Sequence, residues 1–92
     1  MAVEYIRLKE GRNLSNSAYK ILEIIEKKGS INASDLTNQL TVSTRTVHYS
    51  LKRLLEKSII EKKPYLLDMR QTRYSLNDEI VQQMYRMNLL NK

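Results

Sequence analysis

The chain has 92 residues, of which 41% are hydrophobic and 28% are charged, and its formal net charge is +6. These values indicate one small folded domain with a single core rather than a disordered chain. The absence of cysteine excludes disulfides and thiolate metal sites, and no Gly-rich phosphate loop, HExxH pair or credible Ser/His/Asp set is present. We therefore expect neither an enzyme nor a protein with a cofactor or a metal.

The first third of the chain is predicted to be mainly helical. Residues 2–10 fit a strand or a short helix equally well. Capping residues at 13–17 then precede apolar residues at helical spacing, which predict a helix up to Lys28. Gly29 follows as a left-handed C-terminal cap. Residues 30–31 are too short for an independent strand but can extend the edge of a hairpin.

Two further helices are predicted next, separated by a very short connection. Asn32 is the expected N-cap of a helix over residues 33–40, and Ser43 that of a helix over residues 43–57. Only residues 41–42 lie between them. A short helix, a tight connection and a longer helix form a helix-turn-helix, the arrangement that places its second helix in the DNA major groove.

The helix over residues 43–57 has one apolar face and one polar, basic face. At about 100° per residue, Val47, Leu51 and Leu54 share a narrow arc that must face the core. The opposite face suits the major groove, where arginine can donate two hydrogen bonds to guanine. The alternative is a solvated face that happens to be basic. The candidate DNA contacts of this helix are Ser43, Thr44, Arg45, Thr46, His48, Tyr49, Lys52 and Arg53.

Residues 59–67 and 71–76 are predicted to be two strands of a hairpin, joined around residues 68–70. Pro64 lacks an amide proton, so its strand should lie at an edge. The cations of the hairpin can reach an adjacent minor groove, whose negative potential attracts arginine. Asp68 either braces Arg70 through a charge-assisted pair or is an exposed turn residue without a function. The candidate DNA contacts of the hairpin are Lys62, Lys63, Arg70 and Arg73.

The last predicted helix spans residues 77–92, with Asn77 as its N-cap. Its apolar stripe either pairs with a second subunit or folds back on the chain's own core. We favour a homodimer, because two modules on one duplex double the contacts. The candidate dimer residues are Ile80, Val81, Met84 and Met87.

The positive charge is concentrated in one segment. Residues 43–76 hold eight Lys or Arg against three acidic residues, a net charge of +5 out of the +6 of the whole chain. Such localisation is typical of a surface for double-stranded DNA. The function is then that of a sequence-specific regulator, with an architectural DNA-binding protein and a protein-contact module as alternatives. No apolar run reaches the roughly 20 residues of a membrane helix, and we expect a cytoplasmic, nucleoid-associated protein.

Two segments carry a resemblance to a known family. Residues 36–60, LTNQLTVSTRTVHYSLKRLLEKSII, resemble the helix-turn-helix of winged helix-turn-helix regulators. The segment LLDMRQTRYSLNDE is similar to the MarR family pattern, in which a D-x-R turn precedes a strand and a helix; Asp68, Arg70, Leu76 and Asn77 match it. The resemblance implies that Arg70 enters the minor groove and that Asp68 braces it.

The resemblance also implies the fold class. We expect a mostly helical α+β winged helix, with a three-helix core at 14–57, a wing at 58–76 and a C-terminal helix at 77–92. Thr41 and Ser58 stand where related motifs often have glycine. MarR proteins are longer, so the resemblance suggests a small member without a separate sensor domain, and the Lys- and Ile-rich composition suggests an archaeal origin.

Overall fold

The structure, a computed structural model, describes the backbone of residues 2–90 and the side chains of residues 2–86. Residues 2–10 form a helix, which decides between the two predicted possibilities. Within the described residues, no helix combines the length and apolar character needed to span a membrane. The elements in chain order are α1 (Ala2–Glu10), the 3-10 helix η1 (Gly11–Asn13), α2 (Asn16–Lys28), β1 (Ser30–Ile31), α3 (Ala33–Gln39), α4 (Thr44–Glu56), β2 (Ile60–Tyr65), β3 (Asp68–Leu76) and α5 (Asp78–Leu90).

The helices begin where capping side chains stand in the sequence. The Asn32 side chain accepts a hydrogen bond from the Asp35 amide at 2.8 Å, and the Ser43 hydroxyl accepts one from the Thr46 amide at 3.2 Å. These bonds satisfy amides that have no partner within the first turn of a helix. The predicted caps of α3 and α4 are therefore confirmed, and the connection between the two helices is as short as expected.

A single cluster of apolar side chains lies beneath α2, α3 and α4. The predicted inner arc of α4 is confirmed, since Val47, Leu51 and Leu54 are at most 2% exposed. They meet fully buried side chains of α2 and α3, and α1 closes the cluster with Val3 and Ile6. The contributions of α2, α3 and β1 to this cluster include Ile21, Leu22, Ile25, Leu36 and Ile31.

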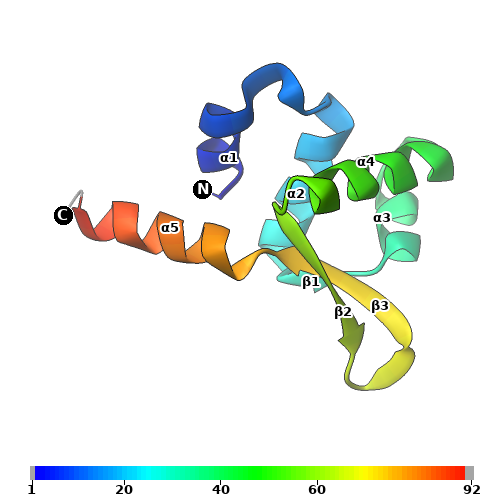
Figure 1. The fold of residues 1–92 in the computed structure, drawn as a ribbon. Helices are drawn as coiled ribbons and strands as arrows, with labels where there is room; N and C mark the ends of the chain where they lie inside the picture. Colours follow the sequence, from blue (N-terminus) through cyan, green and yellow to red (C-terminus); the bar gives the residue numbers. More distant parts are fainter. Residues whose placement is uncertain (1, 91–92) are drawn as a thin grey trace.

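The sheet is antiparallel and its strands lie in the order β1-β3-β2. β2 is an edge strand, which confirms the prediction made from Pro64. The predicted position of the hairpin turn is wrong, because Tyr65 pairs with Asp68 and the turn residues are Leu66 and Leu67. The β2–β3 hairpin, which we call the wing, extends away from the helices in Figure 1.

Three residues of β3, numbers 69–71, have no counterpart on β2, because the next pair after Tyr65 and Asp68 is Pro64 and Thr72. The Asp68 carboxylate accepts a hydrogen bond from the Arg70 amide at 3.1 Å inside this bulge. A local bond from an aspartate to the amide two residues on competes with regular pairing. The bulge therefore has a local physical cause, and bulges change the direction in which side chains point.

α5 leaves the core on the side opposite the wing and extends outward (Figure 1). Its first turn stays attached, because Ile80 packs against the core cluster. One turn further, the Gln83 side chain accepts a hydrogen bond from the Tyr5 hydroxyl at 2.7 Å. Part of the predicted stripe thus serves the chain's own fold, while the side chain of Met87 lies outside the described residues.

Two helix ends require a left-handed backbone. Gly29, the C-cap of α2, has φ +83°, and Ser58, just after α4, has φ +59°. The Ile59 amide donates to the Leu54 carbonyl at 3.0 Å across Ser58. This closes the end of α4 in the manner that usually employs glycine. Ser58 thus holds a conformation that is unfavourable for a residue with a side chain.

We expect Gly29→Ala and Ser58→Gly to change stability in opposite directions. An added Cβ at Gly29 meets nothing within 4 Å, so only backbone strain of about 1–2 kcal/mol should destabilise this variant. Ser58→Gly should instead stabilise by up to about 1 kcal/mol, since relief of strain exceeds the added freedom of the unfolded chain. Urea unfolding measures both values, and equal signs would contradict the backbone argument.

Candidate nucleic-acid interface

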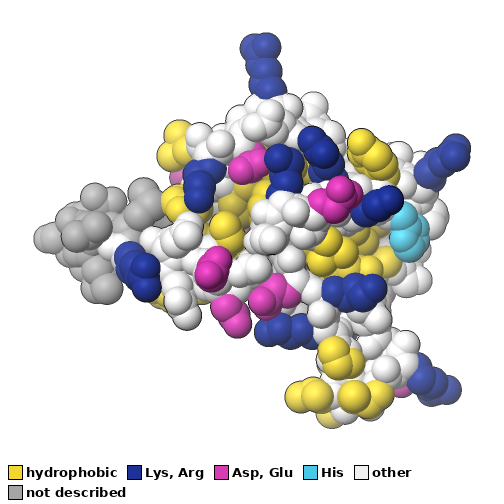
Figure 2. Space-filling view, viewed as in Figure 1, with side chains coloured by type: hydrophobic (Ala, Val, Ile, Leu, Met, Phe, Trp, Pro, Cys, Tyr) yellow, Lys and Arg dark blue, Asp and Glu magenta, His cyan; other side chains and the backbone are white. Residues whose placement is uncertain are grey.

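The outer face of α4 is fully available to a partner. Arg45, His48, Tyr49 and Lys52 are all exposed, although Tyr49 is a large aromatic residue and is 68% exposed. In the described part of the chain, neither Arg45 nor Lys52 forms an ion pair. The helix is held by its buried arc, so its donors project from a rigid element. Figure 2 shows cationic side chains along this side of the molecule, with the histidine beside them.

The hydroxyl groups at the start of α4 have two different roles. The hydroxyl oxygens of Ser43 and Thr46 lie 3.0 Å apart, and Ser43 also caps the helix. Thr44 is exposed and, with His48, borders a hollow of about 190 Å³ against α3. Ser43 and Thr46 thus stabilise the start of α4, whereas Thr44 lies exposed at the surface.

The other border of the α4 face adjoins the N-terminus of α2. Tyr49 and Arg53 line a hollow of about 300 Å³ together with Asn13 and Ser15. Neither Asn13 nor Ser15 was predicted to belong to this surface. In the sequence both residues were interpreted only as helix-capping residues. The packing of α2 beside α4 is what places them next to Arg53.

Two cations of the wing extend into solvent. Arg70 is 92% exposed, and its Nε donates a hydrogen bond to the Asp68 carboxylate at 3.2 Å. Asp68 therefore bonds to both the backbone and the side chain of Arg70. Lys62 is exposed as well. Lys63 forms an ion pair with Glu61 at 3.2 Å, and this hydrogen-bonded carboxylate raises the pKa of Lys63.

Arg73 differs from the other cations of the wing because its guanidinium is bound within the fold. Its Nε donates to the Ser30 hydroxyl at 3.0 Å, and its Nη2 donates to the Ser30 carbonyl at 2.9 Å. The guanidinium also lies over the Tyr65 ring, 4.7 Å from its centre. Arg73 faces Lys63 directly across the strands, a pairing of like charges that is unfavourable unless each finds another partner. Arg73 therefore links β1 to the wing.

The tip of the wing is apolar, a feature that was not predicted from the sequence. Leu66, Leu67 and Met69 are 85%, 84% and 65% exposed. Figure 2 shows these apolar side chains gathered at the end of the wing, with a cationic side chain next to them. The signal was present in the sequence as two leucines beside Asp68, but the wrong position of the turn assigned them to a strand.

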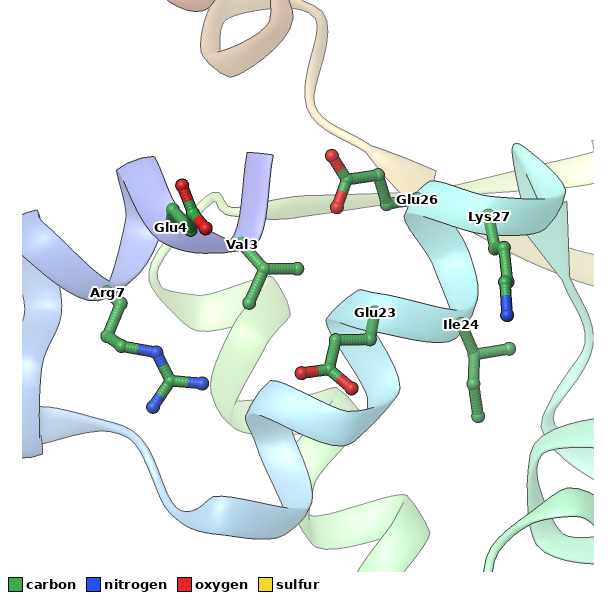
Figure 3. Close-up of a pocket in the computed structure, with 7 residues that line it drawn as sticks. All are labelled: Val3, Glu4, Arg7, Glu23, Ile24, Glu26 and Lys27. Carbon is green, nitrogen blue, oxygen red and sulfur yellow. The ribbon is translucent and has the colours of Figure 1, made fainter. Parts of the chain in front are cut away.

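A groove between α1 and α2 lies away from this basic surface. It has a volume of about 630 Å³ and is lined by Glu4, Arg7, Glu23, Glu26 and Lys27 with two aliphatic residues. Figure 3 shows side chains of α1 and α2 on the two sides of it. Three carboxylates against two cations make this lining unsuitable for a polyanion. Within the described residues, no group of three His, Asp or Glu side chains is arranged to hold a metal ion.

Comparisons with known proteins identify the family and the fold. The model of the MarR family matches residues 14–72. Among solved structures, the YusO protein of Bacillus subtilis has 24% sequence identity and a TM-score of 0.67, covering 85% of this chain and 53% of its own. The reduced form of MarR from E. coli has 24% identity and a TM-score of 0.68, covering 87% of this chain and 57% of its own.

A third similar structure is the adhesin competence repressor AdcR of Streptococcus pyogenes, with 23% identity and a TM-score of 0.64, covering 97% of this chain and 72% of its own. The chain thus spans little more than half the length of the first two structures. A comparison with curated protein sequences finds no match. The family match extends over most of the chain, from Leu14, just after η1, through the helix-turn-helix and into the wing. This chain belongs to the MarR family and has the winged-helix fold of its regulators.

Proposed function

We propose that this protein is a sequence-specific, double-stranded DNA-binding transcription regulator that acts as a homodimer. In this proposal α4 lies in the major groove and the wing reaches toward the adjacent minor groove. The observation that carries it is the arrangement of cations: Arg45 and Lys52 on the outer face of α4, and Lys62 and Arg70 on the wing, are exposed. A phosphate backbone is the partner that satisfies such a set.

The face of α4 has the chemistry for base recognition as well as for phosphate binding. Arg45 lies in its first turn, where a guanidinium can donate two parallel hydrogen bonds to O6 and N7 of guanine. Tyr49 offers an aromatic edge and a hydroxyl, and Thr44 offers a short hydroxyl at the rim of the face. Phosphate contacts position a protein on the duplex, whereas contacts of this kind specify sequence.

The homodimer would use the part of α5 that extends beyond the core. Val81 and Met84 are partly buried and line a groove of about 530 Å³ with Ala2 and Ile25. Ile80 packs against the chain's own core, so pairing would rest on the residues that follow it. Two copies related by a twofold axis would present two α4 helices to successive turns of the major groove.

Selection of bound sequences from random duplexes at physiological salt tests this proposal. A regulator should enrich a symmetric motif and prefer it at least about a thousandfold over other DNA. Enrichment of no motif, with binding that depends only on salt, would instead identify an architectural protein. Absence of duplex binding would leave a protein-contact module.

Arg45→Ala should lower affinity for the selected motif by about 1–3 kcal/mol and relax the preference at one base pair, if Arg45 contacts guanine. The matched control is Lys27→Ala, which removes a cation from the groove between α1 and α2 and should leave the preference unchanged. Repeating the selection with each variant measures the effect. An unaltered motif for Arg45→Ala would exclude this residue from base recognition.

Lys62→Ala should weaken binding to every duplex by a similar factor, because a lysine on phosphate carries no sequence information. The slope of log K against log salt should fall by about one. Fluorescence anisotropy across a salt series provides the slope. Lys63→Ala is the comparison, since Lys63 is already paired with Glu61 and should change the slope less. Equal slopes for wild type and Lys62→Ala would place Lys62 away from phosphate.

We expect substitution of Arg73 to lower the stability of the fold and substitution of Arg70 to weaken DNA binding. Arg73→Ala loses the two hydrogen bonds to Ser30, and we expect the free energy of unfolding to fall by about 1–2 kcal/mol. Arg70→Ala should stay within about 0.5 kcal/mol of wild type, because an exposed ion pair contributes little, yet it should weaken DNA binding. Urea unfolding and anisotropy measure the two effects. A reversed pattern would contradict the assigned roles.

A further inference from the structure

The apolar tip of the wing is unusual for a hairpin turn. Turn positions favour Gly, Asn, Asp and Ser, which either tolerate special backbone angles or bond to the backbone. Here the two turn residues are Leu66 and Leu67. Among the described residues, Ser58 alone has a positive φ apart from glycines, so this turn does not use the left-handed backbone of the common two-residue hairpins.

The fold does not explain these leucines. At 85% and 84% exposed, Leu66 and Leu67 contribute almost nothing to the core. Met69 adds a third exposed apolar side chain in the bulge, 65% exposed. Replacing any of them with a polar residue would change the stability of the isolated chain little, because an apolar side chain stabilises a fold only when it is buried. The cluster gains stability only when another surface covers it.

The charges around the tip indicate what that surface is. Arg70 follows Met69 directly in the chain and is held in place by Asp68, and Lys62 is exposed further along β2. A second copy docking tip to tip would bring the cations of both chains together, which is unfavourable. A partner with a dense negative backbone and an apolar interior satisfies both features, and duplex DNA has both.

We propose that the tip of the wing is a wedge that enters the minor groove and inserts Leu66 and Leu67 against a base step, bending the duplex. Apolar side chains that partly unstack base pairs from the minor groove kink DNA by about 20–90°. Arg70 lies in the same minor groove beside the tip, and Lys62 contacts the flanking phosphates. The inference rests on the proposed function and adds a preference for flexible pyrimidine–purine steps where the tip lies.

The test compares bending with binding on the same DNA. The full chain is added to a duplex of roughly 40 base pairs with an A·T-rich centre that contains TA steps, labelled at both ends for energy transfer. Anisotropy of one label reports binding, and energy transfer between the labels reports the bend. The variants are the double change Leu66→Ser and Leu67→Ser, and the double change Leu66→Phe and Leu67→Phe, which keeps a wedge. Leu8→Ser is the control, because Leu8 is 84% exposed on α1.

Wild type, the Phe variant and Leu8→Ser should raise energy transfer on binding, whereas the Ser variant should bind without raising it. The affinity of the Ser variant should fall only a few-fold, because the DNA it binds keeps its base pairs stacked and this offsets the missing apolar insertion. Replacing the TA steps with a stiff A-tract should weaken wild type and leave the Ser variant unchanged.

Several outcomes would overturn the wedge. If wild type binds the duplex without bending it, or the Ser variant bends it equally, the tip does not insert and the proposed DNA-binding function stands. If the Ser variant instead abolishes self-association of the free protein in sedimentation experiments, the tip is a contact between copies. If wild type does not bind the duplex at all, the proposed function and the wedge both fail, and anisotropy alone reveals it.

Discussion

The packing of α4 against α2 is the constraint on which the other features of this molecule depend. Val47, Leu51 and Leu54 are almost completely removed from solvent. A helix advances by about 100° per residue, so burying this arc also determines which side chains face outward. Rotating α4 would expose large apolar side chains, each worth roughly 1.5–3 kcal/mol when buried. The outward direction of Arg45 and Lys52 is therefore a consequence of the core.

The wing is attached to the same framework. Ile59 and Ile60, which follow α4 after a two-residue connection, are buried in the core cluster, and the Asn77 amide donates to the Ile59 carbonyl at 2.9 Å. The start of β2 and the end of β3 are thus held together beneath α4. β1, although only two residues long, pairs with β3, and its Ser30 carbonyl accepts a hydrogen bond from the guanidinium of Arg73. The wing therefore has a defined position relative to α4.

Residues of one type have different roles in the wing, and position alone separates them. Arg70 lies in a bulge and is exposed, whereas Arg73 lies in regular pairing and reaches Ser30. Both were predicted from the sequence to contact DNA. The pattern of charges along a sequence shows which residues are cationic, but it does not show which of them are already bound to other groups of the fold. The pairing of Ser30 with Ser75 brings β1 beside Arg73 and joins residues that are distant along the chain. Such a contact has no local signal.

Local physical chemistry was sufficient to predict the helices from α2 onward, their caps and the inner arc of α4, because helix periodicity and capping act within a few residues. It left α1 open between a strand and a helix. It also placed Pro64 at an edge and Asp68 beside Arg70. The position of the wing turn depended instead on competition between the Asp68–Arg70 bond and strand pairing, which periodicity does not represent. Only the tertiary structure decided which cations stay exposed. It also decided that Leu66 and Leu67 lie exposed at the tip of the wing, since exposure depends on neighbours from other parts of the sequence.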